Sequence, residues 1–297
     1  MEKTMIYTIE NKYFKLEAND EGAELWSILD KREDGRPIIW QGDPEVWDEH
    51  SPILFPYCGC LKEGFFVENG ITYNGNPHGF GKTSIHRVKR ISDNSILFSL
   101  EADETTMQMY PWNFELETEY RLEEDKIICI FHVHNRDEKD MPFGLGFHTG
   151  YCCPFSSEYA PSDYRIKFEK SESPIHLQHN ENGNLTGKEV ELFHENNFLT
   201  LDYEQFPQSF ILSNVHSRYI QIEEIPTGRY VRMYPEGAPE MALWSQPDRA
   251  SYVCIQPWYS APDSADSDHS LWHKKDIQIL KAGESRDYQQ IIETGKL

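Results

Sequence analysis

The sequence has little positive charge and no long apolar run. Its 297 residues include 28 Lys and Arg against 50 Asp and Glu, which gives a formal net charge of −22. That charge repels nucleic acid and anionic membrane surfaces, so neither is expected as a partner. No stretch of about 18 consecutive apolar residues occurs, and the first residues lack the apolar core of a signal peptide. We therefore expect a cytoplasmic protein.

The sequence also lacks a cysteine framework. Its six cysteines show neither paired C-x₂-C spacing nor the density of a small secreted scaffold. Cys58 and Cys60 could form a redox pair, but no basic neighbour stabilises a thiolate there, and buried, inert thiols are favoured. The sequence therefore predicts free cysteines and no metal site.

Long amphipathic helices are absent as well, whereas period-two alternation recurs from end to end. Residues 114–122 alternate apolar and charged side chains, which is typical of a half-buried antiparallel strand. The same pattern predicts strands at 14–18, 96–100, 127–134, 164–168, 219–225, 230–234 and 277–280. Residues 171–184 are polar and are interpreted as a long surface loop. We expect an all-β fold with few short helices, in which two large antiparallel sheets pack into one domain over residues 1–297.

Histidine 148 lies in a glycine-rich segment, residues 141–153, between two apolar stretches. Gly144, Gly146 and Gly150 remove side chains around its imidazole and leave room for a ligand. Because the ordinary pKa of histidine is near neutrality, His148 can give or take a proton. A hydrogen-bonded core histidine would show the same local pattern, so this segment by itself leaves both interpretations open.

Several other segments mix aromatic, glycine and polar residues and do not alternate. They cover residues 40–47, 55–62, 77–82 and 253–259, and the third contains His78. Aromatic rings beside polar side chains suit sugar recognition, since a pyranose offers an apolar face for stacking and a rim of hydroxyls. His78 and His148 could then act as a general acid and as a group that orients a hydroxyl.

At this point a family resemblance becomes specific. Five landmarks occur in order: Trp40-Gln41-Gly42-Asp43-Pro44 with Trp47, Ser51 to Pro56, His78-Gly79-Phe80, Met141-Pro142-Phe143 through His148, and Cys254-Ile255-Gln256-Pro257-Trp258. Together they resemble the aldose 1-epimerase (galactose mutarotase) family, and the LacX-like branch in particular. The resemblance covers nearly the whole chain.

The resemblance implies a galactose mutarotase-like β-supersandwich that interconverts the α and β anomers of a free aldose without a cofactor. The implied partner is a monosaccharide, a hexose such as galactose or glucose, and the oligomeric state stays open. By motif position His148 resembles the histidine that protonates the ring oxygen, and His78 resembles the histidine that positions the sugar. Phe147 and Trp258 lie on the same motif segments as possible sugar-contacting aromatics, although plain core packing is an alternative for Trp258.

Two positions depart from the family pattern. Gln256 stands where relatives carry the catalytic glutamate, and an amide can bind a hydroxyl but cannot accept a proton near neutral pH. Cys60 stands where relatives carry an arginine that could hold a sugar oxygen, a loss that Lys62 and Lys82 could partly cover. Asp263 follows Trp258 closely and is a possible substitute base, although an acidic surface loop would explain it equally well.

Three functions therefore remain open from the sequence. The first is a mutarotase-type isomerase whose base position is altered at Gln256. The second is a sugar-binding protein that keeps the cleft and has lost rapid turnover. The third, an epimerase of sugar phosphates, ranks below the others because the chain is acidic and Cys60 replaces the arginine.

Overall fold

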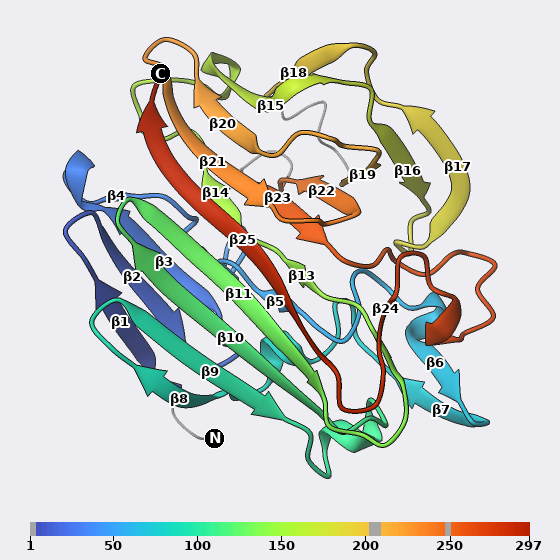
Figure 1. The fold of residues 1–297 in the computed structure, drawn as a ribbon. Coiled ribbons are helices and arrows are strands. Elements are labelled where there is room, and N and C mark those ends of the chain that lie inside the picture. Colours follow the sequence, from blue (N-terminus) through green and yellow to red (C-terminus); the bar gives the residue numbers. More distant parts are fainter. Residues whose placement is uncertain (1–3, 202–208, 247–250) are drawn as a thin grey trace.

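The computed structural model describes residues 4–201, 209–246 and 251–297, and strands dominate it (Figure 1). The larger sheet has nine strands in the order β18 (Asn196–Thr200), β15 (Tyr164–Glu172), β20 (Ile220–Glu224), β21 (Arg229–Pro235), β25 (Ser285–Lys296), β11 (Lys126–Asn135), β10 (Phe114–Glu123), β9 (Ser95–Glu101) and β8 (Arg87–Ile91). Every neighbouring pair in this sheet is antiparallel.

The second large sheet has eight strands and holds the segments that matter for function. Its order is β17 (Leu185–Glu191), β16 (Ile175–His179), β19 (Phe210–Ser213), β22 (Glu240–Trp244), β23 (Tyr252–Trp258), β13 (Gly146–Phe147) and β5 (Ile53–Leu54), and β14 (Gly150–Cys152) also pairs with β23. The landmarks around His148 and Gln256 are therefore neighbours in one sheet.

Smaller elements complete the fold. A four-stranded sheet contains β1 (Ile6–Glu10), β2 (Phe14–Asn19), β3 (Leu25–Asp30) and β4 (Arg36–Pro37), and two ribbons pair β6 (Phe65–Glu68) with β7 (Ile71–Asn74) and β12 (Met141–Phe143) with β24 (Gln278–Leu280). The 3₁₀ turns are η1 (Lys31–Glu33), η2 (Lys62–Gly64), η3 (Gly81–Thr83), η4 (Thr106–Gln108), η5 (Pro161–Asp163) and η7 (Leu271–His273). Across the described ranges, no helix has the length and apolar composition needed to cross a bilayer.

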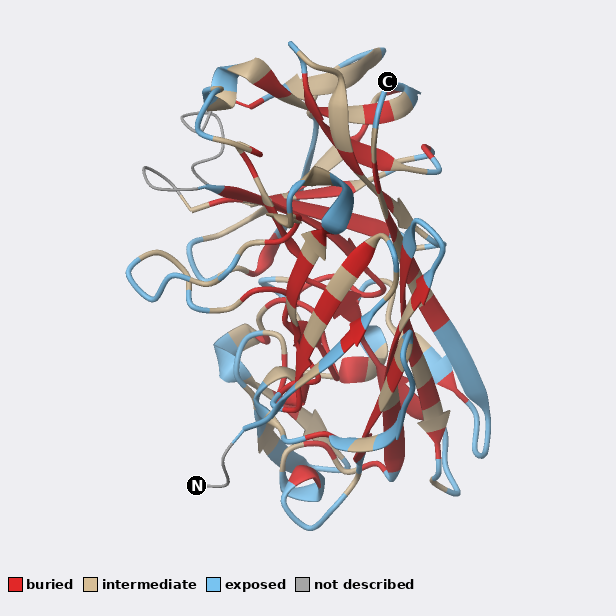
Figure 2. Cartoon of the chain, turned by 90° about the vertical axis from the view of Figure 1, so that its left-hand side faces the viewer, coloured by how far each residue is buried: buried red, intermediate tan, exposed pale blue. Residues whose placement is uncertain are grey.

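The main core lies between the two large sheets and joins them through aromatic contacts. Phe131 on β11 stacks on Phe147 of β13, with ring centroids 4.2 Å apart and 16° between the planes. In Figure 2 the buried residues run along the strands through the middle of the molecule, and the exposed residues lie in outer loops and margins. Burial of this kind, at about 25 cal/mol per Å² of apolar surface, is the main stabilising term of the sandwich.

The alternation in the sequence confirms the all-β prediction strand by strand. In β10, Leu116, Tyr120 and Leu122 enter the core, whereas Glu115 and Glu117 lie on the outer face. The glutamates are tolerated on that face because nearby basic side chains pair with them. Alternating side chains on a two-faced sheet thus account for the antiparallel sandwich.

One prediction about organisation is wrong. Residues 171–184 are not one surface loop, because β16 occupies Ile175–His179 and pairs with both β17 and β19. Leu177 is buried in a small apolar cluster, whereas the residues around it are half-buried polar groups. A strand with a single deeply buried side chain gives too weak an alternation to be recognised in a polar segment.

Candidate active site

Strand β23 alternates between the two faces of the eight-stranded sheet. Val253 and Ile255 belong to the main core, whereas Trp258 packs in a second, smaller apolar cluster on the opposite face. Gln256 precedes Trp258 by two residues and shares that face, where its Oε1 accepts a hydrogen bond from Trp258 Nε1 at 3.2 Å. We name this the site face, the face of the eight-stranded sheet that carries Gln256 and Trp258. Both side chains are deeply buried.

His148 reaches the site face, whereas Phe147 does not. Phe147, the last residue of β13, stacks on Phe131 inside the main core, and His148 follows where the strand has ended. There the ring centroid of His148 lies 5.3 Å from that of Trp47 and 5.7 Å from that of Trp244. Of the two neighbours predicted for the site, the structure therefore brings only His148 to it.

Two glycines allow the tryptophan rings to approach this closely. A Cβ on Gly146 would come within 2.8 Å of Trp258 Cδ1, and a Cβ on Gly150 would come within 2.8 Å of Trp47 Cζ3. Real Cβ atoms do not tolerate such distances, so glycine is required at both positions. The glycines therefore make room for the aromatic wall of the site.

His78 meets His148 edge to face. Their ring centroids are 5.5 Å apart at 82°, and the ring of Trp258 lies 5.7 Å from that of His78. The Gly59 backbone N–H donates to His78 Nδ1 at 3.1 Å. Because that nitrogen accepts, the proton of a neutral His78 must be on Nε2, which leaves an N–H donor for a ligand. Gly79, whose φ is +76°, allows the turn that positions the ring, since a Cβ would clash with the Phe55 carbonyl.

Both histidines are held in the neutral form. Burial lowers the pKa of His148 to about 4, and burial together with the neighbouring His148 lowers the pKa of His78 well below its ordinary value. The Nδ1 atom of His148 is buried and has no hydrogen-bond partner in the described part of the chain. The pair therefore supplies neutral hydrogen-bonding groups at pH 7, and each ring takes up a second proton and becomes positively charged only under more acidic conditions.

A carboxylate that the sequence did not single out lies beside the histidines. Glu49 Oε1 pairs with Lys82 Nζ at 2.7 Å, and Glu49 Oε2 accepts a hydrogen bond from Trp47 Nε1 at 3.2 Å. The charges of Glu49 and Lys82 act in opposite directions on the pKa of His148. Trp47 links this ion pair to His148, so Lys82 reaches the site together with a partner. Glu49 had one weak signal in the sequence, its position two residues after Trp47.

Asp263 and Cys60 adjoin the turn that holds His78, and the Asp263 N–H donates to the Cys60 carbonyl at 3.0 Å. Asp263 is buried in an ion pair with Lys274, whose Nζ lies 2.6 Å from Oδ1, and Oδ2 accepts the Lys62 backbone N–H at 2.9 Å. Cys60 is a partly exposed free thiol, and burial raises its pKa. Among the described residues, no hydrogen bond or ion pair joins either side chain to the two histidines, and both carboxylate oxygens of Asp263 already have partners.

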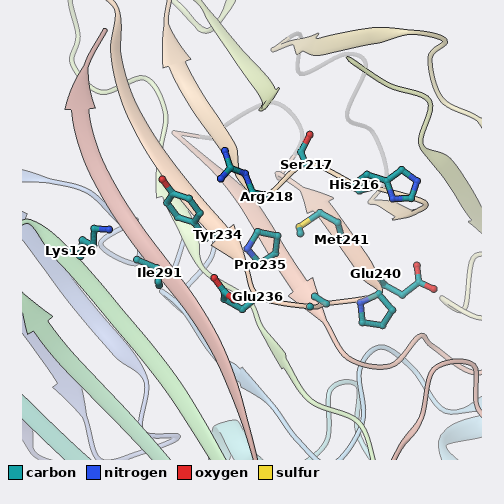
Figure 3. Close-up of a pocket in the computed structure, with 14 residues that line it drawn as sticks. Lys126, His216, Ser217, Arg218, Tyr234, Pro235, Glu236, Glu240, Met241 and Ile291 are labelled. Carbon is teal, nitrogen blue, oxygen red and sulfur yellow. The ribbon is translucent and has the colours of Figure 1, made fainter. Parts of the chain in front are cut away.

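A separate cavity of about 570 Å³ opens between β21 and the segment that leads into β22 (Figure 3). Its cationic residues Lys126 and Arg218 are each paired, with Glu293 and Glu169 respectively. The residues that line it include none of those predicted from the sequence. Within the described residues, no group of three or more His, Cys, Asp or Glu side chains is arranged to hold a metal ion.

Comparison with known proteins identifies the family of the chain. The family model of aldose 1-epimerase matches residues 5–293. The chain is 29% identical over 282 residues to the chromosomal LacX protein of Lactococcus lactis subsp. lactis, a match that covers 92% of this chain and 94% of the relative. A galactose mutarotase related enzyme from Lactobacillus acidophilus has a similar structure, with a TM-score of 0.93, 28% identity and 98% of each chain covered. A galactose mutarotase-like protein from Lactobacillus casei ATCC 334 gives a TM-score of 0.91 at 25% identity, with coverage of 98% and 100%. The chain belongs to the aldose 1-epimerase family.

Proposed function

We propose that this protein interconverts the α and β anomers of a free hexose, such as galactose or glucose, without a cofactor. The observation that carries the proposal is the edge-to-face pair His78 and His148 on the site face, bordered by tryptophan rings and by the ion pair of Glu49 and Lys82. Proton donors and acceptors beside aromatic surfaces are what acid–base chemistry on a sugar ring requires. Family membership supports the same reaction class.

In the proposed reaction Glu49 accepts the proton of the C1 hydroxyl, and His148 gives a proton to the ring oxygen. The electron pair of the breaking bond between C1 and the ring oxygen goes to that oxygen, while a C1 carbonyl forms. Rotation about the bond between C1 and C2 exposes the other face of the carbonyl, and the reverse proton transfers close the ring. His78 Nε2–H and the amide of Gln256 hold sugar oxygens during the exchange.

Glu49 suits the base role better than Asp263 or Gln256. The Glu49 side chain is 32% exposed, so a ligand can reach it, whereas that of Asp263 is 3% exposed and fixed by Lys274. Gln256 lies on the site face, but its amide cannot take a proton near neutral pH. The Lys82 ammonium holds Glu49 Oε1 at 2.7 Å and fixes the position of the carboxylate beside Trp47.

The lowered pKa of His148 implies slow turnover. At pH 7 a histidine with a pKa of about 4 carries the catalytic proton in roughly one molecule in a thousand. The lowered pKa of His148 and the amide at Gln256 favour a second candidate function, that of a sugar-binding protein without appreciable turnover. An epimerase of sugar phosphates is less well supported, because Lys82 is already neutralised by Glu49.

The test is mutarotation of purified α-glucose and α-galactose, followed by polarimetry against a protein-free blank. Glu49→Gln should lower the rate by at least about a hundredfold, since positioned acid–base groups contribute about 10²–10⁴. Glu33→Gln is a matched control, because Glu33 is 30% exposed and pairs with Arg36 outside the site. Full activity in the Glu49→Gln variant would show that another group is the base, and saturable binding without turnover in the unmodified protein would support the sugar-binding role.

Restoring a carboxylate at position 256 gives a complementary result. The Gln256→Glu side chain can still accept the Trp258 Nε1–H bond, so the wall should stay intact. A carboxylate there should raise the mutarotation rate at least tenfold and change hexose affinity much less. An unchanged rate would mean that proton abstraction at position 256 does not limit turnover.

A further inference from the structure

Glu24 is a buried carboxylate bonded to the segment that carries Glu49. It lies in the turn between β2 and β3, and the residue is 9% exposed. Its Oε1 accepts the backbone N–H of His50 at 2.6 Å and that of Ser51 at 2.9 Å. These two residues directly follow Glu49 in the chain. A carboxylate that accepts two N–H groups fixes the backbone immediately beyond the proposed base.

The same turn also contacts the segment that carries Lys82. The Gly22 N–H donates to the Ser84 carbonyl at 2.8 Å. A Cβ on Gly22, whose φ is +71°, would lie 2.5 Å from the Lys82 carbonyl oxygen, so glycine is required for this close approach. Residues 20–24 therefore contact the backbone of Lys82 and also hold the residues that follow Glu49, the other partner of the ion pair.

The residues held by this carboxylate are bonded in turn to the chain that follows His148. The Gly150 N–H donates to the His50 carbonyl at 3.0 Å. Ser51 Oγ lies 2.8 Å from the Oγ1 of Thr149, the residue directly after the histidine. One carboxylate thus supports a continuous set of hydrogen bonds between the backbone beside the proposed base and the backbone beside the proposed acid.

The segment held by Glu24 has further supports. The His50 ring stacks on that of Trp26, with centroids 3.9 Å apart and 30° between the planes. Its Nδ1 lies 3.1 Å from the Trp40 carbonyl oxygen. Removing the carboxylate of Glu24 therefore releases the backbone beside Glu49 without detaching the whole segment from the fold.

We propose that Glu24 is a positioning residue for proton transfer: by holding the backbone at His50 and Ser51, it directs Glu49 toward the C1 hydroxyl. The inference rests on the proposed function, because it concerns the base of the same reaction. Misplacing a catalytic group by about 1 Å can cost roughly a hundredfold in rate. Burial raises the pKa of Glu24 to about 7, so the carboxyl is partly neutral at that pH, and its acceptor oxygen matters more than its charge.

The test compares Glu24→Ala with Glu24→Gln in the mutarotation of α-glucose, with kcat and KM determined separately by polarimetry. Glu24→Ala loses the acceptor, so kcat should fall at least about tenfold while KM changes less than about threefold. Glu24→Gln keeps an acceptor of the same shape and should retain kcat within about threefold.

Glu172→Ala is the matched control. The buried carboxylate of Glu172 accepts the His216 N–H at 3.0 Å outside the site, so its loss should lower stability and leave kcat unchanged. Thermal unfolding checks that each variant is folded. Glu24→Leu, which fills the space without an acceptor, replaces Glu24→Ala if that variant does not fold.

A double variant tests whether Glu24 acts through Glu49. In a Glu49→Gln background the base is already lost, so Glu24→Ala should lower the remaining rate less than about twofold. A purely structural role would lower the rate by the same factor in both backgrounds. Equal factors would overturn the inference, as would an unchanged kcat in Glu24→Ala or an equal loss of kcat in Glu24→Gln.

A measurement that needs no turnover separates this inference from the isomerase proposal. Trp47 Nε1–H donates to Glu49 Oε2 at 3.2 Å, so its indole signal in a ¹H–¹⁵N NMR spectrum, assigned with Trp47→Phe, reports the position of the carboxylate. The signal should move in Glu24→Ala and stay in place in Glu24→Gln and Glu172→Ala. That pattern in a protein without mutarotation would refute the isomerase proposal alone. An unmoved signal in Glu24→Ala would refute the positioning role, whatever the turnover.

Discussion

Replacing Asp263 by asparagine separates an architectural role from a catalytic one. The change leaves the Lys274 ammonium, whose side chain is 1% exposed, without the carboxylate that lies 2.6 Å away. Breaking a buried ion pair by removing one partner typically costs about 3–5 kcal/mol, which for a chain of this length lowers Tm by roughly 6–10 °C. The turn at Lys62 also loses a charged acceptor. We therefore expect a less stable protein whose folded fraction still turns over hexoses.

The cost should also depend on pH. Burial already lowers the pKa of Lys274, and without Asp263 this pKa falls further below that of the unfolded chain. The unfolded state then binds more protons, so the stability of the variant rises with pH and the loss is larger at pH 6 than at pH 9. Urea unfolding at the two pH values measures this loss of stability. The control is Asp268→Asn, because Asp268 forms an exposed ion pair with His273.

Two results would contradict this reasoning. An Asp263→Asn protein as stable as the unmodified chain would show that the ion pair with Lys274 does not support the fold. A variant of normal stability that lost more than a hundredfold in mutarotation rate would make Asp263 the base and Glu49 a bystander. Asp268→Asn should change stability little in either case.

Three further outcomes are expected. The mutarotation rate should rise about tenfold per unit as pH falls from 7 to 6, because the pKa of His148 is about 4 and only the protonated ring is an acid; a flat profile from polarimetry would argue against this role. Burial raises the pKa of Glu24 to about 7, so the ionised carboxylate destabilises the folded protein as pH rises from 4.5 to 7. Glu24→Gln keeps the acceptor for the His50 and Ser51 N–H groups and carries no charge. Its free energy of unfolding, measured with urea, should exceed that of the unmodified chain by up to about 3 kcal/mol by pH 7. Phe147→Ala should cost about 3–5 kcal/mol by the same method and leave hexose affinity of the folded protein nearly unchanged.

The sandwich could be predicted because alternation is local. The charged face of β10 and the apolar residues between the charges are consecutive in the sequence, so six or more residues are enough to recognise the strand. Strand β16 was missed because Leu177 is its one deeply buried side chain, and its pairing with β19 depends on residues more than 30 positions away. Local patterns contain no information about such partners.

The site was predictable in part for a related reason. His78 and His148 were found because each lies in a glycine-rich motif, and the fold places their rings 5.5 Å apart. Glu49 was not found, since its meaning comes from Lys82, which is 33 residues away and reaches it only in the folded chain. Asp263 was assigned to the sugar from its place near Trp258, but its partner is Lys274. Residue type and spacing do not reveal which charges will meet.

Phe147 was predicted to contact the sugar, but its ring packs against Phe131 in the main core. Side chains at successive positions of a strand point to opposite faces. Phe147, the last residue of β13, points to the main core, whereas His148 follows the strand and meets Trp47 and Trp244. The same rule places Gln256 and Trp258 together, as their hydrogen bond shows. In β22, Trp244 lies on the site face and contacts His148, whereas Leu243 points to the main core. Once one residue of each strand is assigned to the site face, its neighbours two positions away become the side chains that can alter sugar recognition, and the residues between them are constrained by packing.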